Sequence, residues 1–497
     1  MGRNSKYKRI QSLATIIAED CNEGGDGSVV SEWVVNINSI LKKGVVYDSG
    51  KKWTVYRVPT NILKIHRKAF LPKIISIGPF HYRDPRLRVM DEHKERYLFR
   101  LLGGKLSKSL TKEYQEEDLG REIIEELGEQ DNAVEGVKKV TLEVLEAAMK
   151  KLMPKTRETY SEVLTMSNAK FVEMMVLDGC FVVELLRLYH KSLKVKIDDA
   201  IFTTRWMLRT LQRDLLMLEN QLPFFVLEEL YELTKLDEHE PPLINLVLEF
   251  LNPLLPRKKY KTKFKNVVPE HILDVLLLSF ISPMQKKVTN SSWSYMTENN
   301  RSSYVNRAQE RQLIHCVTEL QEVGVLFRRG EDKNLLDIKF SNGILQIPPL
   351  YINDNTVPIF LNFLAYEQCD QEAEPYFTNF FTFLDGLISS SKDVKILHQY
   401  EIINHALGSK ENVANLFNKV CRELVFDVDH CYLSQQMVEV NQYWTDYYAT
   451  KWHVWRTNLI HDYFSSPWTA ISLGAAILLL ILTALQTVYS AITFYHP

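Results

Sequence analysis

The amino-acid sequence predicts a mainly α protein: a large helical domain with a small β-hairpin element and a C-terminal transmembrane helix. Apolar residues recur at helical spacing along most of the chain, which is the pattern of helices with one buried face. An Asn-Gly pair at Asn342 lies between two short apolar runs, as in a β-hairpin. No Asp, Glu, Lys or Arg occurs from Tyr463 through Tyr495, so this end of the chain is apolar enough to enter a bilayer.

Size and composition narrow the class of protein. The chain has 497 residues, 45% of them hydrophobic, enough for roughly two to four folding units or one large helical domain with two lobes. Its 60 Lys and Arg nearly balance its 62 Asp and Glu, which argues against a nucleic-acid partner. The six cysteines form no Cys-x-x-Cys pair, which indicates a reducing compartment. We expect no cleaved signal peptide, because the apolar run Leu13–Ala18 is short and acidic residues follow it.

The N-terminal half begins with a predicted flexible arm at residues 1–45, where a short amphipathic stretch precedes a Gly-rich one. The helical domain is expected over 46–465. Its first segment, Trp53–Phe80, contains three widely spaced prolines and predicts extended chain. Residues 111–160 predict charged surface helices, and apolar periodicity predicts further helices at Met90–Leu102, Phe171–Tyr189 and Trp206–Leu218.

Two irregular stretches follow these helices. The run of Lys and Arg at 257–265 would suit anionic lipid or an acidic partner, although such runs are more often simply solvated. Residues 285–309 are rich in Ser and Asn and predict a long exposed loop that separates two lobes and offers a surface for a protein partner.

The C-terminal half is predicted to contain the hairpin and a second series of helices. The hairpin strands are expected at Leu335–Phe340 and Ile344–Ile347. Helices are expected at Gln312–Val323, Val357–Gln368, Phe377–Ile388, Val394–Leu407 after Asp393 as cap, Asn412–Leu424 after Ser409, and Val440–Phe464. In the last of these, Trp452 and Trp455 suit a partner helix, a bilayer surface or a core equally well.

The transmembrane helix is expected over residues 468–495. Leu and Ile dominate this segment, and Trp468 and Tyr489 place aromatic rings near its two ends. Lys451 and Arg456 precede the segment and no Lys or Arg follows it. This bias predicts a single-pass protein with a cytosolic N-terminal domain and membrane lipid around the helix, the plasma membrane being one location that fits.

A first group of polar residues has the chemistry of metal ligands. His81 and His93, with Asp91 and Glu92, offer imidazole and carboxylate donors. Their spacing matches no established metal site, and a charged surface helix explains the same residues without a metal. We therefore favour the structural interpretation.

Two further pairs suit catalysis. Asp178 and Cys180 place a thiol beside a carboxylate, but no cationic neighbour in the sequence would stabilise the thiolate. The alternative is a packed helix in which Gly179 permits close contact and the acids find internal hydrogen bonds. Asp214 and Glu219 suit an acid and base pair, although a buried structural network at the end of a helix explains them better.

Established catalytic motifs are absent. The sequence contains no Walker-type loop, Gly-x-Gly-x-x-Gly, His-Glu-x-x-His or Gly-x-Ser-x-Gly. We therefore assign no catalytic, cofactor-binding or metal-ligating residue and expect no cofactor.

From about residue 55 to its end, the sequence resembles the plant domain of unknown function 247 family, also called uncharacterised protein family 0481. The matching pieces include Tyr56-Arg-Val-Pro59, Ile75-Ser-Ile-Gly-Pro-Phe-His81, Glu92-His-Lys94, Leu177-Asp-Gly-Cys-Phe181, Asp214, Leu218-Glu-Asn-Gln-Leu-Pro-Phe224, Ile347-Pro-Pro-Leu350, Tyr366-Glu-Gln-Cys369 and Pro467-Trp468. Here Tyr-Arg follows His81, where the family often has His-Gly or a similar pair. The resemblance implies a plant membrane protein, and some grass members are implicated in self-incompatibility between pollen and stigma. It supplies no catalytic residues.

These observations favour a membrane-anchored recognition or signalling protein without catalytic activity. The resemblance implies a relation to self-incompatibility-type recognition. The alternative is a membrane-associated hydrolase or transferase that uses the pairs at Asp214 and Asp178.

Overall fold

The computed structural model describes residues 53–103, 140–235, 237, 239–254, 268–281, 313–331, 334–370, 372–427, 431–449 and 467–495. Several predictions fall outside these residues and stay predictions: the arm at 1–45, the first part of the surface helices at 111–139, the basic run 257–265, the loop 285–309 and the flanking residues Lys451, Trp452, Trp455 and Arg456.

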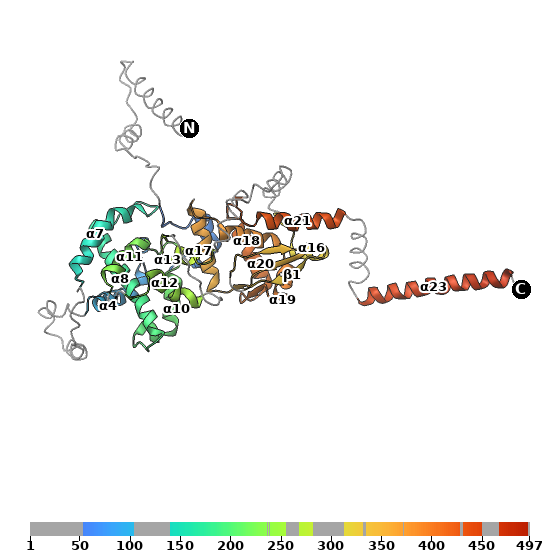
Figure 1. Cartoon of the computed structure of the whole chain (residues 1–497), viewed down its shortest axis with the longest axis horizontal. Coiled ribbons are helices and arrows are strands. Elements are labelled where there is room, and N and C mark those ends of the chain that lie inside the picture. Colours follow the sequence, from blue (N-terminus) through green and yellow to red (C-terminus); the bar gives the residue numbers. More distant parts are fainter. Residues whose placement is uncertain are drawn as a thin grey trace, which may run out of the picture. The chain divides into compact units, whose positions relative to one another are not determined.

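The N-terminal half is organised around α8 (Asn168–Ser192), which is buried along most of its length. Ser167 caps the helix by accepting a hydrogen bond from the Lys170 N–H. Among the described elements, four helices pack extensively against α8: α4 (Asp91–Leu101), α7 (Leu142–Glu158), α11 (Phe224–Leu233) and α12 (Leu243–Leu251), all labelled in Figure 1. A Cβ atom at Gly179 would collide with Leu230 of α11. This confirms that Gly179 permits close helix contact.

Shorter elements complete this half. They are α3 (Thr60–Ile65), η1 (Arg67–Ala69), η2 (Pro85–Met90), α9 (Ala200–Thr203), α10 (Arg205–Asp214), η3 (Asn252–Leu254) and α13 (Ile272–Leu278). The prediction of extended chain over Trp53–Phe80 is wrong for α3, because Pro59 precedes the helix and a proline before the first turn leaves the helical hydrogen bonds intact.

The C-terminal half combines helices with two small sheets. Its helices are α16 (Val317–Glu322), α17 (Thr356–Cys369), α18 (Tyr376–Leu387), α19 (Ser391–Gln399), α20 (Lys410–Cys421), α21 (Ser434–Ala449) and α23 (Pro467–Tyr495). Its strands are β1 (Leu326–Arg329), β2 (Lys339–Ser341), β3 (Ile344–Ile347), β4 (Leu350–Ile352) and β5 (Ile403–His405). Helix α17 contacts α13 and η1, so buried side chains join this half to the first.

The predicted hairpin is present. β2 and β3 pair antiparallel, with Phe340 opposite Leu345. The turn residues Asn342 and Gly343 have φ angles of 51° and 74°, as a two-residue hairpin turn requires. The first strand is shorter than expected, and β1 adds to the other edge of β3 in parallel.

One predicted helix is replaced by a helix and a strand. The expected helix Val394–Leu407 ends early, as α19, and β5 follows it and pairs in parallel with β4. Asp393 is not the cap residue itself: Ser390 is, and the Asp393 side chain accepts from the Ser390 backbone N–H in a capping box. Glu401, with φ of 56°, turns the chain between α19 and β5.

The prediction for residues 468–495 needs correction. The segment forms the helix α23, and its described apolar side chains are exposed, Leu480 by 71%. Nevertheless, no helix in the described part of the chain combines the length and apolar character that a bilayer crossing requires. The transmembrane helix and the single-pass membrane location inferred from it are therefore not supported.

Candidate functional site

An irregular segment, residues 73–78, is held in place by side chains from distant parts of the chain. The buried Asp214, the last residue of α10, accepts hydrogen bonds at Oδ2 from the backbone N–H groups of Lys73 (2.7 Å), Ile74 (2.8 Å) and Ile75 (3.3 Å). Arg213 donates to its other oxygen, Oδ1, at 2.9 Å. Since buried polar groups require partners, this carboxylate replaces the backbone pairing that a strand would supply.

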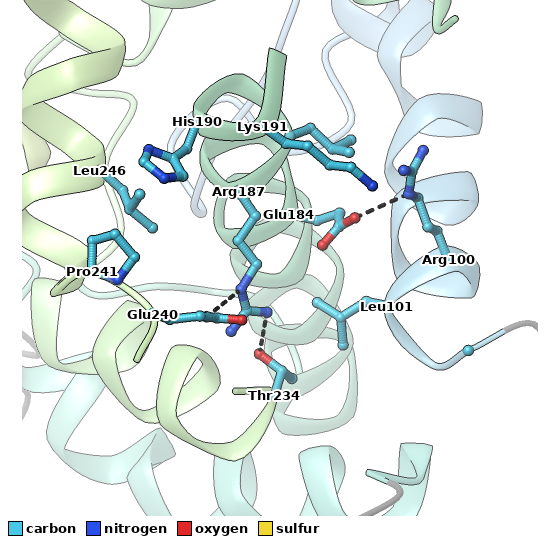
Figure 2. A pocket seen from close by; sticks show the side chains of 12 residues that line it. Arg100, Leu101, Glu184, Arg187, His190, Lys191, Thr234, Glu240, Pro241 and Leu246 are labelled. Carbon is cyan, nitrogen blue, oxygen red and sulfur yellow. Dashed lines mark hydrogen bonds and ion pairs between the residues drawn. The ribbon is translucent and has the colours of Figure 1, made fainter. Parts of the chain in front are cut away.

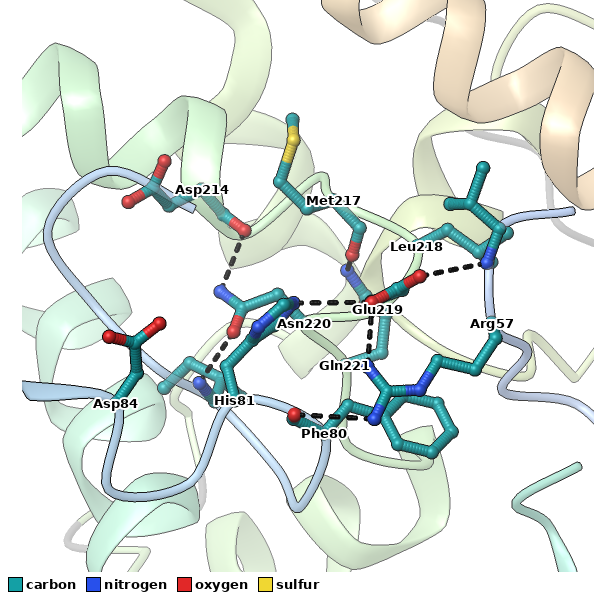
Figure 3. A network of polar contacts seen from close by, with 12 residues as sticks. Arg57, Phe80, His81, Asp84, Asp214, Met217, Leu218, Glu219, Asn220 and Gln221 are labelled. Carbon is teal, nitrogen blue, oxygen red and sulfur yellow. Dashed lines mark hydrogen bonds and ion pairs between the residues drawn. The ribbon is translucent and has the colours of Figure 1, made fainter. Parts of the chain in front are cut away.

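Asn220 also holds the segment 73–78 in place. Figure 3 shows it between the segment 73–78 and the turn that follows α10. Its Oδ1 accepts from the Ile77 N–H at 2.7 Å, and its Nδ2 donates to the carbonyls of Ile75 (3.2 Å) and Asp214 (2.9 Å). Both N–H donors of the Asn220 amide and one lone pair of its oxygen are therefore used within the chain.

A buried ion pair closes the end of the segment. Lys94 of α4 donates through Nζ to Asp178 Oδ1 at 2.6 Å and to the Ser76 carbonyl at 2.5 Å. Asp178 Oδ2 accepts from the Gly78 N–H at 2.9 Å. Burial raises the pKa of Asp178, and Lys94 opposes that shift. Gly78 has φ of 77°, and a Cβ there would lie 2.5 Å from the Gln221 carbonyl oxygen, so only glycine fits.

A second cluster lies where this network reaches the surface. Arg57 donates through Nη1 to Glu219 Oε2 at 2.8 Å, and Glu219 Oε1 accepts from the Val58 N–H at 2.9 Å. The buried His81 Nε2 is 3.5 Å from Glu219 Oε2 and has no hydrogen-bond partner in the described part of the chain. Burial lowers the pKa of His81, although Glu219 acts in the opposite direction. The cluster is an imidazole beside a carboxylate that an arginine holds (Figure 3).

The two pairs considered for catalysis are both part of the structure's internal bonding. Asp214 and Glu219 bind different partners and do not act on each other through any hydrogen bond among the described residues. Burial raises the pKa of the Cys180 thiol to about 12, so it is not a thiolate near neutral pH. Asp178 is paired with Lys94. The expectation of a structural network is confirmed for Asp178 and Asp214.

The residues considered as metal ligands have separate partners. His81 faces Glu219, whereas the His93 Nδ1 lies 3.0 Å from Arg96 Nη2. A cationic neighbour of this kind disfavours a metal ion. Within the described ranges, no three His, Cys, Asp or Glu side chains are grouped as a metal site would require.

A pocket of about 420 Å³ lies elsewhere, between α4, α8 and the start of α12. Figure 2 shows Arg100 and Lys191 extending toward Glu184 from α4 and α8. Arg100 Nε and Glu184 Oε1 are 3.1 Å apart. On the other side, Arg187 donates to Glu240 (3.1 Å) and Thr234 (2.9 Å).

Charge and burial distinguish this pocket. Three cationic side chains, Arg100, Arg187 and Lys191, line it together with two carboxylates, Glu184 and Glu240. Burial raises the pKa of Glu184, and Arg100 and Arg187 oppose the shift. Leu101, Leu188, Pro241 and Leu246 supply an apolar wall. A pocket with an apolar wall and a few convergent polar groups is the usual form of a small-molecule site.

Sequence reasoning did not find the pocket. In the sequence, Glu184 is one acid within a mostly apolar helix, and Arg100 and Lys191 look like ordinary basic residues in the last turns of their helices. The available signal was the spacing of Glu184, Arg187 and Lys191, which places three charges on one face of α8.

The fold and these sites define a mainly helical protein with an internal polar network around residues 73–78 and a separate pocket. The family model described as "plant protein of unknown function", DUF247, matches residues 55–482. The chain belongs to this plant family. A UPF0481 protein of Arabidopsis thaliana is 29% identical over 451 residues, which cover 89% of this chain and 87% of that relative.

A second relative extends the comparison. A putative UPF0481 protein of Arabidopsis thaliana is 21% identical over 538 residues, covering 92% of this chain and 94% of that relative. No solved structure matches the chain.

Proposed function

We propose that this chain is a recognition protein without catalytic activity, and that it binds a small ligand in the pocket between α4, α8 and α12. The observation that carries the proposal is the pocket itself. Its volume of about 420 Å³ lies within the roughly 300–1,000 Å³ of small-molecule sites.

The hydrogen bonds of the buried polar network support a binding role over a catalytic one. The side chains of Asp178, Asp214 and Asn220 accept hydrogen bonds from the chain's own backbone. The needs of folding therefore explain these residue types without a substrate. The partner surface predicted at 285–309 lies outside the described residues. The pocket is therefore the feature on which recognition can be tested directly.

The test blocks the pocket and follows a neutral fluorescent ligand, phenylnaphthylamine. Leu101 is half-buried at the pocket wall, so Leu101→Trp should fill the space and reduce dye binding at least tenfold. Val144→Trp on α7, an exposed apolar residue that does not line the pocket, is the matched control and should leave binding unchanged. Equal binding by the wild-type chain and Leu101→Trp would refute the proposal.

A hydrolase or transferase is the second candidate, favoured by the contact between His81 and Glu219. A neutral imidazole near a carboxylate is the arrangement of a general base. If this candidate holds, His81→Gln abolishes turnover of simple ester or phosphoester substrates while the melting temperature stays within a few degrees. No turnover by the wild-type chain, or turnover that His81→Gln retains, eliminates it.

A further inference from the structure

We propose that the pocket selects an amphipathic molecule with one anionic group, which Lys191 and Arg100 hold while the apolar wall covers the rest. This inference rests on the proposed function, because it names the class of ligand for the same pocket. The anionic group is a carboxylate, sulfonate or phosphate, since all three present oxygen acceptors to cationic donors.

The first step in the argument is the balance of charge. Each carboxylate of the pocket already has an arginine: Glu184 pairs with Arg100 and Glu240 with Arg187. Lys191 forms no ion pair or side-chain hydrogen bond among the described residues, and its charge acts on Glu184 only at longer range. One positive charge is therefore left over at the pocket, where an anion would neutralise it.

The second step concerns which arginine is available to a ligand. Arg187 is committed, because its three donor nitrogens bind Glu240, Thr234 and the Tyr231 carbonyl. Among the described residues, the Arg100 side chain forms one ion pair, from Nε to Glu184, and it is 44% exposed. Its remaining N–H groups form a fork that can take an oxyanion in two hydrogen bonds. Arg100 and Lys191 thus form the anion-facing side of the pocket (Figure 2).

The third step is the wall that receives the rest of the ligand. Leu101 follows Arg100 on α4, and Leu188 lies one turn before Lys191 on α8. Leu246 of α12 lies on the opposite side of the pocket from Leu101 (Figure 2). A purely ionic ligand such as inorganic phosphate would leave these side chains uncovered, whereas an amphipathic anion uses both parts of the site.

A competing explanation for the basic residues is their position in the last turns of helices. Cations there stabilise the helix dipole without any ligand. The two explanations differ in their effect on ligand choice. Stabilisation of the dipole alone would leave the preference between charged and neutral ligands unchanged when Lys191 is replaced.

The experiment compares two dyes that share an aromatic body, anilinonaphthalene sulfonate and neutral phenylnaphthylamine, on the full chain. Only the dye fluorescence that is lost in the Leu101→Trp variant is counted as binding to the pocket. Dye bound to the exposed helix α23 therefore does not contribute. Lys191→Met and Arg100→Met should each weaken the sulfonate dye about tenfold and leave the neutral dye unchanged. Lys194→Met is the matched control, because it removes the same charge from an exposed site just beyond α8.

A second variant tests the role of Glu184. Glu184→Gln removes the carboxylate that competes for Arg100, so the sulfonate dye should bind several-fold more tightly. If Lys191→Met and Arg100→Met weaken both dyes equally or neither dye, the anion inference is overturned while the pocket stands. If Leu101→Trp leaves the binding of both dyes unchanged, the proposed function itself is refuted.

Discussion

Single residues inside the domain carry charge that the fold must neutralise. Lys94 and Asp178 are almost fully buried and 2.6 Å apart. Losing one partner leaves the other charge unpaired in the interior, which costs far more than losing both. The stability of α4 against α8 therefore depends on this pair as well as on apolar packing.

Lys94→Met should lower the free energy of unfolding by about 3–5 kcal/mol, because the Asp178 carboxylate then lacks its cation. Lys94→Met combined with Asp178→Asn should recover part of this loss. Urea unfolding followed by circular dichroism measures both. Lys151→Met, an exposed lysine on α7, should change stability by less than about 0.5 kcal/mol. A double variant no more stable than Lys94→Met would show that charge is not the cause.

His271 gives stability a dependence on pH. It caps α13 by accepting the Asp274 N–H at Nδ1, 3.1 Å away, and burial lowers its pKa from 6.5 to about 3. The unfolded chain therefore binds a proton more readily than the folded chain. The stability that neutral His271 contributes is complete above pH 6.5 and is lost as the pH falls toward 3.

His271→Asn should keep the cap and remove this dependence, because Asn caps helices well and does not titrate. Between about pH 7 and pH 4, the wild-type chain should lose on the order of 3 kcal/mol more unfolding free energy than the variant. Urea unfolding at several pH values measures the difference. His66→Asn, at an exposed histidine, is the control and should follow the wild-type curve. Parallel curves for wild type and His271→Asn would contradict the assignment.

At the scale of elements, the hairpin turn is also a docking point. A Cβ at Gly343 would lie 2.9 Å from the Tyr443 hydroxyl oxygen of α21, and the Phe340 ring packs edge-on against Tyr443. The turn thus meets α21 directly. This contact requires both a positive φ and the absence of a side chain at Gly343.

Gly343→Ala should therefore cost more than Gly324→Ala. Both glycines have positive φ, but nothing lies within 4 Å of a Cβ at Gly324, so that variant measures backbone strain alone, about 1 kcal/mol. Gly343→Ala should cost a further 1–2 kcal/mol or so through the clash with Tyr443. It should also speed hydrogen exchange in α21. Equal effects of the two substitutions would show that the turn does not support α21.

Secondary-structure elements can be predicted from the sequence where a local signal is strong, such as apolar spacing over many residues or a turn dipeptide. Helix α8 and the hairpin turn at Asn342 were found this way, because apolar spacing and turn chemistry are local signals. Strands β4 and β5 were missed, since strands of three residues are too short to show alternation and their pairing is non-local. The membrane assignment failed differently: low charge and apolar composition over 468–495 were read as a span, which the helix α23 does not support.

For the candidate sites too, the sequence indicates local features but not contacts between distant segments. Asp178 and Asp214 were identified from the sequence as members of a buried network, because acids in apolar helices need partners. Their partners, the backbone N–H groups of 73–78, were not identified, since nothing in the sequence pairs segments so far apart. The pocket was missed because Arg100 and Lys191 meet only through the packing of α4 on α8.

At the scale of the whole molecule, Asn362 links the two halves. It lies on α17 with 0% exposure. Its Oδ1 accepts from the Leu218 N–H at 2.8 Å, and its Nδ2 donates to the Ala69 carbonyl at 3.1 Å. One side chain of the C-terminal half thereby satisfies two backbone groups of the N-terminal half.

Asn362→Leu should destabilise the protein by about 2–5 kcal/mol, because it leaves these two groups buried without partners. Calorimetry should still record one unfolding transition, at a lower temperature. Asn415→Leu, at an exposed position of α20, should have little effect. A loss below about 1 kcal/mol, or a wild-type chain that already unfolds in two steps, would contradict this account.

The segment 73–78 has a consequence for how this family varies in length. Five of its six backbone N–H groups and two of its carbonyls bond to side-chain atoms of Asp178, Asp214, Asn220 or Lys94. Inserting or deleting a single residue would shift all of these contacts out of register at once, whereas an ordinary surface loop absorbs such a change. Relatives should therefore keep the number of residues between Pro72 and Pro79 fixed even where the side chains differ.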